Sequence, residues 1–126
     1  MQDLIGTVWR VTDVRAFDEA GREQPSPMGP EPMGVIAFEA GRMMGAIGDA
    51  RAPAAPGEAP RRYASYTGGW RIEGDRIVVT PDAATAADLM SEQVRQFRFE
   101  GASRLVLIPP PRAGNITVEV GWERLR

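Results

Sequence analysis

Three polar residues combine a reactive side chain with a position on an expected apolar face: Tyr66, Arg95 and Asp13. Arg95 alternates with Phe97 and Phe99, so we expect all three side chains on one face of a strand. A guanidinium on such a face needs a carboxylate, a carbonyl or an anionic ligand as its partner. Arg95 is therefore predicted to anchor the carboxylate or enolate oxygen of a ligand. The alternatives are a structural ion pair with an internal acid, or a strand bulge that turns Arg95 out to solvent.

Tyr66 shares the strand parity of Trp70 and Ile72, which places it on the same inward face. Its hydroxyl could donate a hydrogen bond to a ligand carbonyl, or act as a general acid beside Arg95. An aromatic core residue with a satisfied hydroxyl has the same pattern. Both interpretations of Tyr66 stay open at this stage.

Asp13 matches Trp9 and Val11 in parity, so we expect it to point inward and to face Arg95. A carboxylate opposite a guanidinium in an apolar barrel would suit the abstraction of a proton from an activated carbon. A structural ion pair has the same appearance. Asp13 is therefore a candidate catalytic residue, together with Tyr66 and Arg95.

The residue types that are missing exclude several kinds of chemistry. The chain contains no Cys, no His and no Lys, and all fifteen of its positive side chains are arginine. A disulfide framework, a thiolate nucleophile, a Ser-His-Asp triad and side-chain Schiff-base chemistry are thereby excluded. The usual ligands of zinc are missing as well. We expect no metal site and no resident cofactor.

A short motif occurs three times between segments of alternating apolar residues: an acidic residue, a turn that contains glycine, and then an arginine. This pattern predicts three β-hairpins. Their turns fall at Ala40-Gly41, at Gly74-Asp75 and at residues 101–103. These turn lengths fix the register. The large apolar residues that then face each other are Phe38 and Met43, Ile72 and Ile77, Trp70 and Val79, Phe99 and Leu105, and Phe97 and Leu107. A Glu–Arg pair is expected outside each turn: Glu39 with Arg42, Glu73 with Arg76, and Glu100 with Arg104.

With further strands at about residues 7–17 and 115–125, the hairpins predict an all-β fold, an eight-stranded antiparallel up-and-down barrel with little helix. The tight turns close one end, and the long loops at residues 18–33, 49–62, 82–92 and 110–114 surround the other. Proteins with concave sites of this kind bind ligands in the mouths of their barrels. The side chains expected to bind a ligand are Phe38, Met43, Tyr66, Trp70, Arg95, Phe97 and Leu107.

Five short segments, in this order along nearly the whole chain, resemble the bacterial and fungal lipocalin-like domain family. They are Leu4-Ile5-Gly6-Thr7-Val8-Trp9-Arg10-Val11, then Gly34-Val35-Ile36 leading to Gly41-Arg42-Met43, Tyr63-Ala64-Ser65-Tyr66-Thr67-Gly68, Gln93-Val94-Arg95-Gln96-Phe97, and Trp122-Glu123-Arg124. The resemblance implies an eight-stranded barrel and, for many members, a cavity for a small hydrophobic molecule. It also implies that Trp9 closes the floor of the barrel and that Arg124 packs over it. It implies no single shared activity.

Length and charge limit the classes of partner. The 126 residues predict a single domain, residues 1–126, with one core. The net charge of −2 offers no basic surface for nucleic acid or an anionic membrane. The start, Met1-Gln2-Asp3, lacks a signal-peptide pattern, and no apolar run is long enough for a membrane helix. We therefore expect a cytoplasmic protein whose partner is a small molecule.

Three functions remain open on the sequence. The leading one is the binding of a small, largely hydrophobic molecule that bears a carbonyl or a carboxylate. The alternative is a cofactor-independent isomerase, cyclase or dehydratase that acts on a natural-product intermediate in the same cavity, through positioning and through Tyr66, Arg95 and Asp13. The third is a filled barrel that serves as an interaction module, for example as a homodimer.

Overall fold

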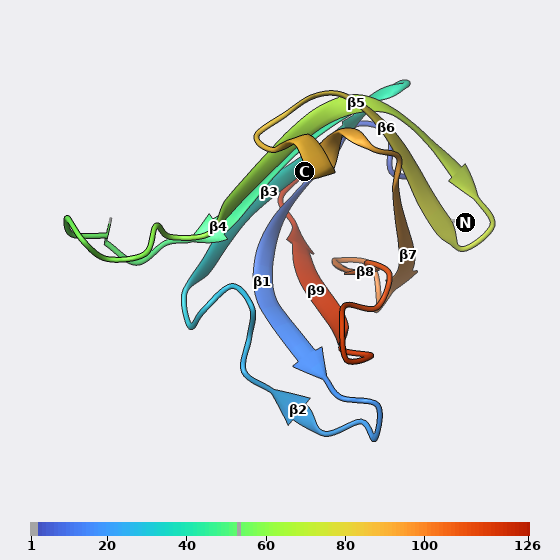
Figure 1. Ribbon diagram of the computed structural model, residues 1–126. Helices are drawn as coiled ribbons and strands as arrows, with labels where there is room; N and C mark the ends of the chain where they lie inside the picture. The colour runs from blue at the N-terminus through green and yellow to red at the C-terminus, as the bar shows by residue number, and fades with distance from the viewer. Residues whose placement is uncertain (1–2, 53) are drawn as a thin grey trace.

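The chain forms one closed antiparallel β-barrel of eight long strands, which is consistent with a lipocalin-like fold and confirms the expected fold class (Figure 1). The computed structural model describes residues 3–52 and 54–126. Consecutive strands of the barrel pair with one another, and β1 pairs with β9 to close it. The barrel strands are β1 (Thr7–Phe17), β3 (Pro32–Glu39), β4 (Arg42–Asp49), β5 (Tyr63–Glu73), β6 (Arg76–Ala84), β7 (Gln93–Phe99), β8 (Arg104–Ile108) and β9 (Thr117–Arg124). The two-residue strand β2 (Glu23–Gln24) pairs with the end of β1.

The three tight hairpins have the expected register. Phe38 pairs with Met43, Trp70 with Val79, and Phe97 with Leu107. Glycines with positive φ angles, Gly41, Gly74 and Gly101, stand in the turns, where residues with a Cβ would be strained. Because the pleat has a period of two, this register sends the large apolar side chains of each hairpin to the inside.

The residues expected to face each other beside the turns do so, since Glu39 pairs with Arg42 and Glu73 with Arg76 in the strand register. Among the described residues, however, their side chains form an ion pair with each other only at the third hairpin. Glu100 accepts a hydrogen bond from Arg104 Nε at 2.8 Å, as expected. Arg42 instead donates to Asp82 on β6 at 2.9 Å, and Arg71 is the partner of Glu73. Exposed ion pairs contribute little free energy, so the backbone register does not dictate which carboxylate each arginine selects.

The floor of the barrel is filled by large side chains. Trp9 is 1% exposed, and its indole N–H donates to Thr7 Oγ1 at 2.8 Å. The guanidinium of Arg124 lies 6.0 Å from the centre of the Trp9 ring, in the arrangement that the family resemblance implies. Leu4, which precedes β1, is fully buried in the same core. Floor packing of this kind leaves the other end of the barrel as the place for a cavity.

A β-bulge changes the facing of β1 halfway along its length. The pairing with β9 shifts between Val11 and Asp13, so that Val14 and Ala16 continue the buried face that Trp9 and Val11 begin. An extra residue of this kind reverses the parity of everything that follows it. On its other side, β1 pairs with β3 from Thr7 to Arg10, and its end, Ala16 and Phe17, pairs with β2.

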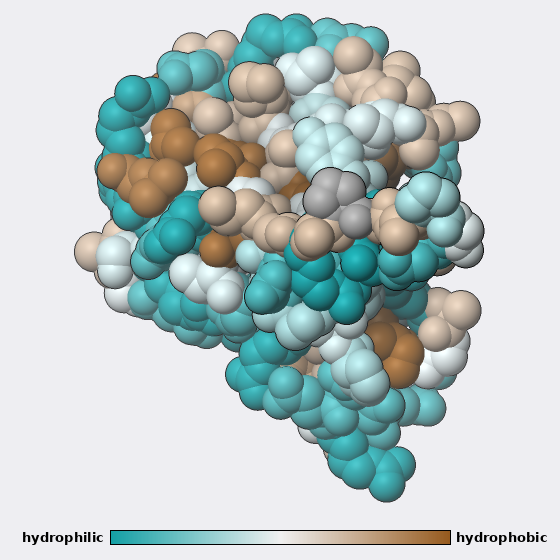
Figure 2. Space-filling view, turned by 90° about the vertical axis from the view of Figure 1, so that its left-hand side faces the viewer, coloured by the Kyte–Doolittle hydropathy of each residue, from teal (hydrophilic) through white to brown (hydrophobic). Residues whose placement is uncertain are grey.

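The loops between the tight hairpins gather at the opposite end. The loop before β5 extends from the barrel (Figure 1), and the short 3-10 helix η1 (Ala87–Met90) lies between β6 and β7. Viewed from the side of that loop, the lower tip formed by the β1–β2 hairpin is hydrophilic, whereas hydrophobic side chains gather on the left of the face (Figure 2). In the part of the chain that the structure describes, no helix is long and apolar enough to cross a membrane.

Candidate functional site

A cavity of about 200 Å³ opens among the loops at the end of the barrel opposite the tight turns, and we call it the mouth cavity. That volume is below the roughly 300–1,000 Å³ of pockets for drug-sized molecules, so it suits a small ligand. Most of its wall is apolar, and this part of the wall comes from both loops and strands: Val14, Pro27, Met28, Ile36, Ile47, Ala64, Leu89, Leu107, Pro109, Val118 and Val120. The polar groups along the wall belong to Tyr66, Arg95, Arg112 and Trp122. A largely apolar wall with a few polar groups is the usual form of a small-molecule site.

The barrel is filled below this cavity. A void of about 10 Å³ lies there, and Phe38 and Met43 line it at 0% and 3% exposure. Tyr66, Arg95 and Leu107 line both the cavity and the void. Of the seven residues expected to contact a ligand, these three therefore reach the cavity, while Phe38 and Met43 form the packing beneath it.

The other two expected contact residues, Trp70 and Phe97, line neither space. Trp70 packs against Phe38 with 5.0 Å between ring centres, and its indole N–H donates to the Glu39 carbonyl at 2.8 Å. Phe97 meets Phe99 edge to face at 5.9 Å. Both residues face inward as the register requires, but they do so at the level of the filled core.

Arg95 is partly buried and faces the interior, where its partners are neutral oxygens. Nη1 donates to the Val94 carbonyl and Nη2 to Gln93 Oε1, each at 2.9 Å. Gln93 is buried, and its amide NH₂ donates to the carbonyls of Leu89 and Ser91. The loop between β6 and β7 thus fixes the amide of Gln93 so that its oxygen points at Arg95. These bonds use two of about five N–H groups of a guanidinium, so others remain for a ligand.

Tyr66 pairs with Gly45 on β4 and with Ala84 on β6, and it lines the mouth cavity as well as the hollow on the outer face described below. Its hydroxyl forms no hydrogen bond with the residues that the structure describes. The phenol is therefore available to a ligand on both its donor and its acceptor side.

The expectation that Asp13 points inward is wrong. The bulge in β1 turns Asp13 to the outer face, where Oδ1 accepts hydrogen bonds from Arg104 Nη1 at 3.0 Å and Thr12 Oγ1 at 2.7 Å. Partial burial raises the pKa of this carboxyl, but the hydrogen bonds from Arg104 and Thr12 outweigh it and the net pKa is lowered. Asp13 is thus an ionised, paired surface group, and it does not face Arg95.

Two polar residues of the cavity wall, Arg112 and Trp122, were not predicted from the sequence. Arg112 stands in the loop between β8 and β9, where no strand period assigns a facing. The expected grouping of the long loops at one end of the barrel could have indicated that Arg112 lies near the cavity. Trp122 on β9 is 5% exposed, and its indole N–H is a buried donor without a partner among the described residues. Its parity with Val118 and Val120 could have placed it on the inner wall.

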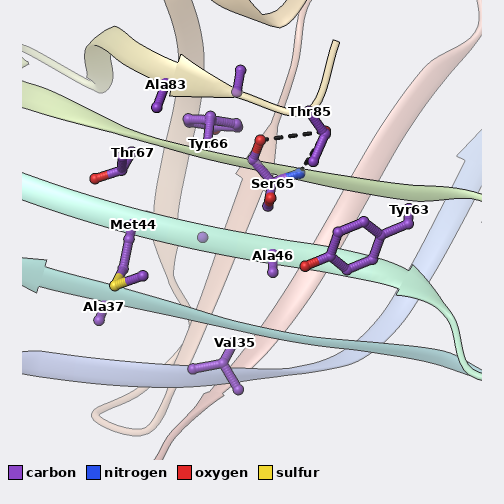
Figure 3. Close-up of a pocket in the computed structure, with 12 residues that line it drawn as sticks. Val35, Ala37, Met44, Ala46, Tyr63, Ser65, Tyr66, Thr67, Ala83 and Thr85 are labelled. Atoms are coloured by element: carbon purple, nitrogen blue, oxygen red, sulfur yellow. Dashed lines mark hydrogen bonds between the residues drawn. The ribbon is translucent and has the colours of Figure 1, made fainter.

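A larger hollow, of about 540 Å³, lies on the outer face of β3 to β6 (Figure 3). Tyr63 and Met44 stand toward its two ends, and the Ser65 N–H donates to Thr85 Oγ1 at 3.1 Å along one side (Figure 3). None of the described residues that line it is charged. This outer groove offers apolar contact but no ionic group to orient a ligand, so the mouth cavity is the better candidate site.

Within the part of the chain that the structure describes, no group of three or more acidic residues is placed to hold a metal ion. No family model matches the chain, and no curated protein matches it in sequence. The function therefore has to be argued from the geometry of the cavity.

Proposed function

We propose that the protein binds a small, largely hydrophobic molecule in the mouth cavity, with a carbonyl or carboxylate of the ligand hydrogen-bonded to Arg95. The observation that carries this proposal is a partly buried guanidinium on the wall of a largely apolar cavity of about 200 Å³. Removal of apolar ligand surface from water supplies the binding free energy, and the polar contacts fix the orientation. The ordered motifs and the barrel also support a place in the lipocalin-like domain family.

The enzyme alternative has less support from this geometry. Asp13 lies outside the barrel, and the described residues that line the cavity include no carboxylate. Tyr66 is then the remaining group on the wall that could transfer a proton to or from a bound molecule. Binding requires only the contacts that the cavity provides, and so it is the function that we propose.

A titration with 2-naphthaldehyde and 2-naphthoate, followed by tryptophan fluorescence, tests the proposal because Trp122 lines the cavity. We expect saturable binding of at least one probe, weakened by Ala64→Leu, which fills the cavity from β5. Met44→Gln on the outer groove is the matched control and should leave the affinity unchanged. If Met44→Gln abolished binding while Ala64→Leu did not, the site would be the outer groove and the proposal would be wrong.

The same variants separate binding from turnover. Arg95→Ala is expected to weaken the binding of both probes, and Tyr66→Phe to weaken it less, since a phenol contributes one hydrogen bond. Chemical conversion of a bound carbonyl compound that Tyr66→Phe abolishes, with affinity retained, would instead support the enzyme alternative.

A further inference from the structure

The arginines of this protein divide into two groups by their partners. Ten of the fifteen form an ion pair with an acidic side chain of the described residues. The two that line the mouth cavity, Arg95 and Arg112, are not among the ten. Arg95 is bonded to neutral oxygens, and the Arg112 side chain has no hydrogen bond to the described residues; only its backbone N–H is bonded, to the Ile116 carbonyl. In a protein where most guanidiniums find a carboxylate, the cavity holds two that do not.

The charge on the cavity wall is therefore of one sign. Its described lining residues include two guanidiniums and no carboxylate. A charge at an apolar wall interacts more strongly with an opposite charge than it would in water, because the effective dielectric constant is lower. Hydrogen bonds from Arg95 to the Val94 carbonyl and to Gln93 occupy two of its N–H groups but do not neutralise its charge. An anion in the cavity would supply that neutralising charge.

The two arginines stand at different depths of the site. Arg95, on β7, lines both the cavity and the small void below it, and it is partly buried. Arg112 lies on the exposed loop between β8 and β9, and it lines the cavity at its rim. The rest of the wall is apolar and includes Ile36, Ile47 and Val118. A ligand that satisfies this arrangement has one anionic group and a hydrocarbon part.

On the basis of the proposed binding function, we infer that the ligand is an organic monocarboxylate, and that Arg112 is the residue that selects its charge. The carboxylate accepts hydrogen bonds from Arg95 and lies within the field of Arg112, while the hydrocarbon part packs against the aliphatic wall. Arg95 can bond a neutral carbonyl as well as a carboxylate. Arg112, at the rim, attracts only the negative charge, which makes it the specificity-determining residue.

Three probes that share one ring system test the inference: 2-naphthoate, 2-naphthaldehyde and 2-naphthylmethylamine. We expect naphthoate to bind about tenfold more tightly than the aldehyde, the amine to bind most weakly, and the preference for naphthoate to shrink as salt is added. Arg112→Gln should weaken naphthoate binding several-fold and leave aldehyde binding unchanged. Arg95→Gln should weaken both.

Arg62→Gln is the matched control, because Arg62 also lacks an ion pair among the described residues but does not line the cavity. Thermal unfolding of each variant verifies that it folds. Equal affinities for naphthoate and the aldehyde in the unmodified protein, or equal losses in Arg112→Gln and Arg62→Gln, would overturn the inference and leave the proposed binding function standing. Binding of none of the three probes would instead count against the proposed function itself.

Discussion

Arg104 and Asp13 form an ion pair across β9 on the outer face of the barrel, with Nη1 and Oδ1 3.0 Å apart. The pair lies directly above Gly121, where a Cβ atom would come within 2.6 Å of Arg104 Nη2. Gly121 pairs with Asp13 in one direction and with Val106 in the other. The absence of a side chain on β9 is therefore what allows an arginine of β8 to reach a carboxylate of β1.

Replacement of Gly121 by Ala is expected to destabilise the protein by about 1–3 kcal/mol, because the new methyl group displaces the ion pair and crowds the surface of the sheet. Urea unfolding measures the change. Gly69→Ala on β5 is the control, since the nearest atom to its added Cβ is 3.6 Å away, and it should be neutral or slightly stabilising. Equal effects of the two substitutions would show that the space above Gly121 is not needed.

Acid is expected to lower the stability of the protein by protonating Asp49, which is paired with Arg51. Hydrogen bonds from the side chain and the backbone of Arg51 lower the pKa of Asp49 from 3.8 to about 2. Because the folded pKa is below the unfolded one, the unfolded state binds more protons as the pH falls. The stability from this pair is complete above about pH 5 and is lost as the pH falls toward 2.

Comparison of Asp49→Asn with the unmodified protein isolates that contribution, since the other acidic groups are common to both. The difference in melting temperature should be large at pH 7 and should shrink between pH 4 and pH 2. The pKa values of Asp13 and Glu100 are also lowered, so the unmodified protein retains a further acid dependence. A difference that stays constant from pH 7 to pH 2 would contradict the prediction.

Truncation of Phe38 is expected to change both stability and the depth of the cavity. Phe38→Ala should destabilise the protein by about 3–5 kcal/mol, since Phe38 is fully buried. It should also enlarge the void of about 10 Å³ beneath the cavity, so that longer n-alkanoates bind than in the unmodified protein. Phe97→Ala, at an aromatic position that does not line the void, should cost stability without lengthening the accepted chain. Identical chain-length limits in all three proteins would show that the void does not join the cavity.

The contact between Arg124 and Trp9 should contribute modestly to stability. Arg124→Gln removes a guanidinium 6.0 Å from the Trp9 ring and is expected to cost about 0.5–1 kcal/mol, the usual range for an exposed cation–π contact. Denaturant unfolding checks it against Arg126→Gln, which removes an equal charge two residues away. If Arg126→Gln lowered the stability as much as Arg124→Gln or more, the loss would come from the change in net charge and not from the contact with Trp9.

The sequence predicted the barrel and its register because two independent patterns agreed. Glycine turns and alternating apolar residues both required Phe38 opposite Met43 and Phe97 opposite Leu107, and the structure has these pairs. A slip by one residue would have turned every large side chain outward. Agreement between local turn chemistry and side-chain burial is what made these hairpins predictable.

The position of Asp13 could not be predicted in the same way. Parity holds only while a strand is regular, and the bulge after Val11 leaves no clear mark in the sequence. Arg112 was missed for a related reason, since a loop has no periodicity from which a facing can be read. The sequence also could not predict how deep the cavity is. Strand parity shows that Trp70 and Leu107 face inward, but it does not show which of them lies at the level of the core and which at the level of the mouth.

The seam between β1 and β9 joins the two strands that are farthest apart along the chain, with Trp9 paired to Arg124. The entropic cost of closing a loop rises slowly with its length, and contacts of large sequence separation slow folding. During synthesis, the seam cannot form until β9 has left the ribosome, because β9 is the last strand of the chain. Because β9 supplies Val118, Val120 and Trp122 to the cavity wall, binding of a probe would also report that the barrel has closed.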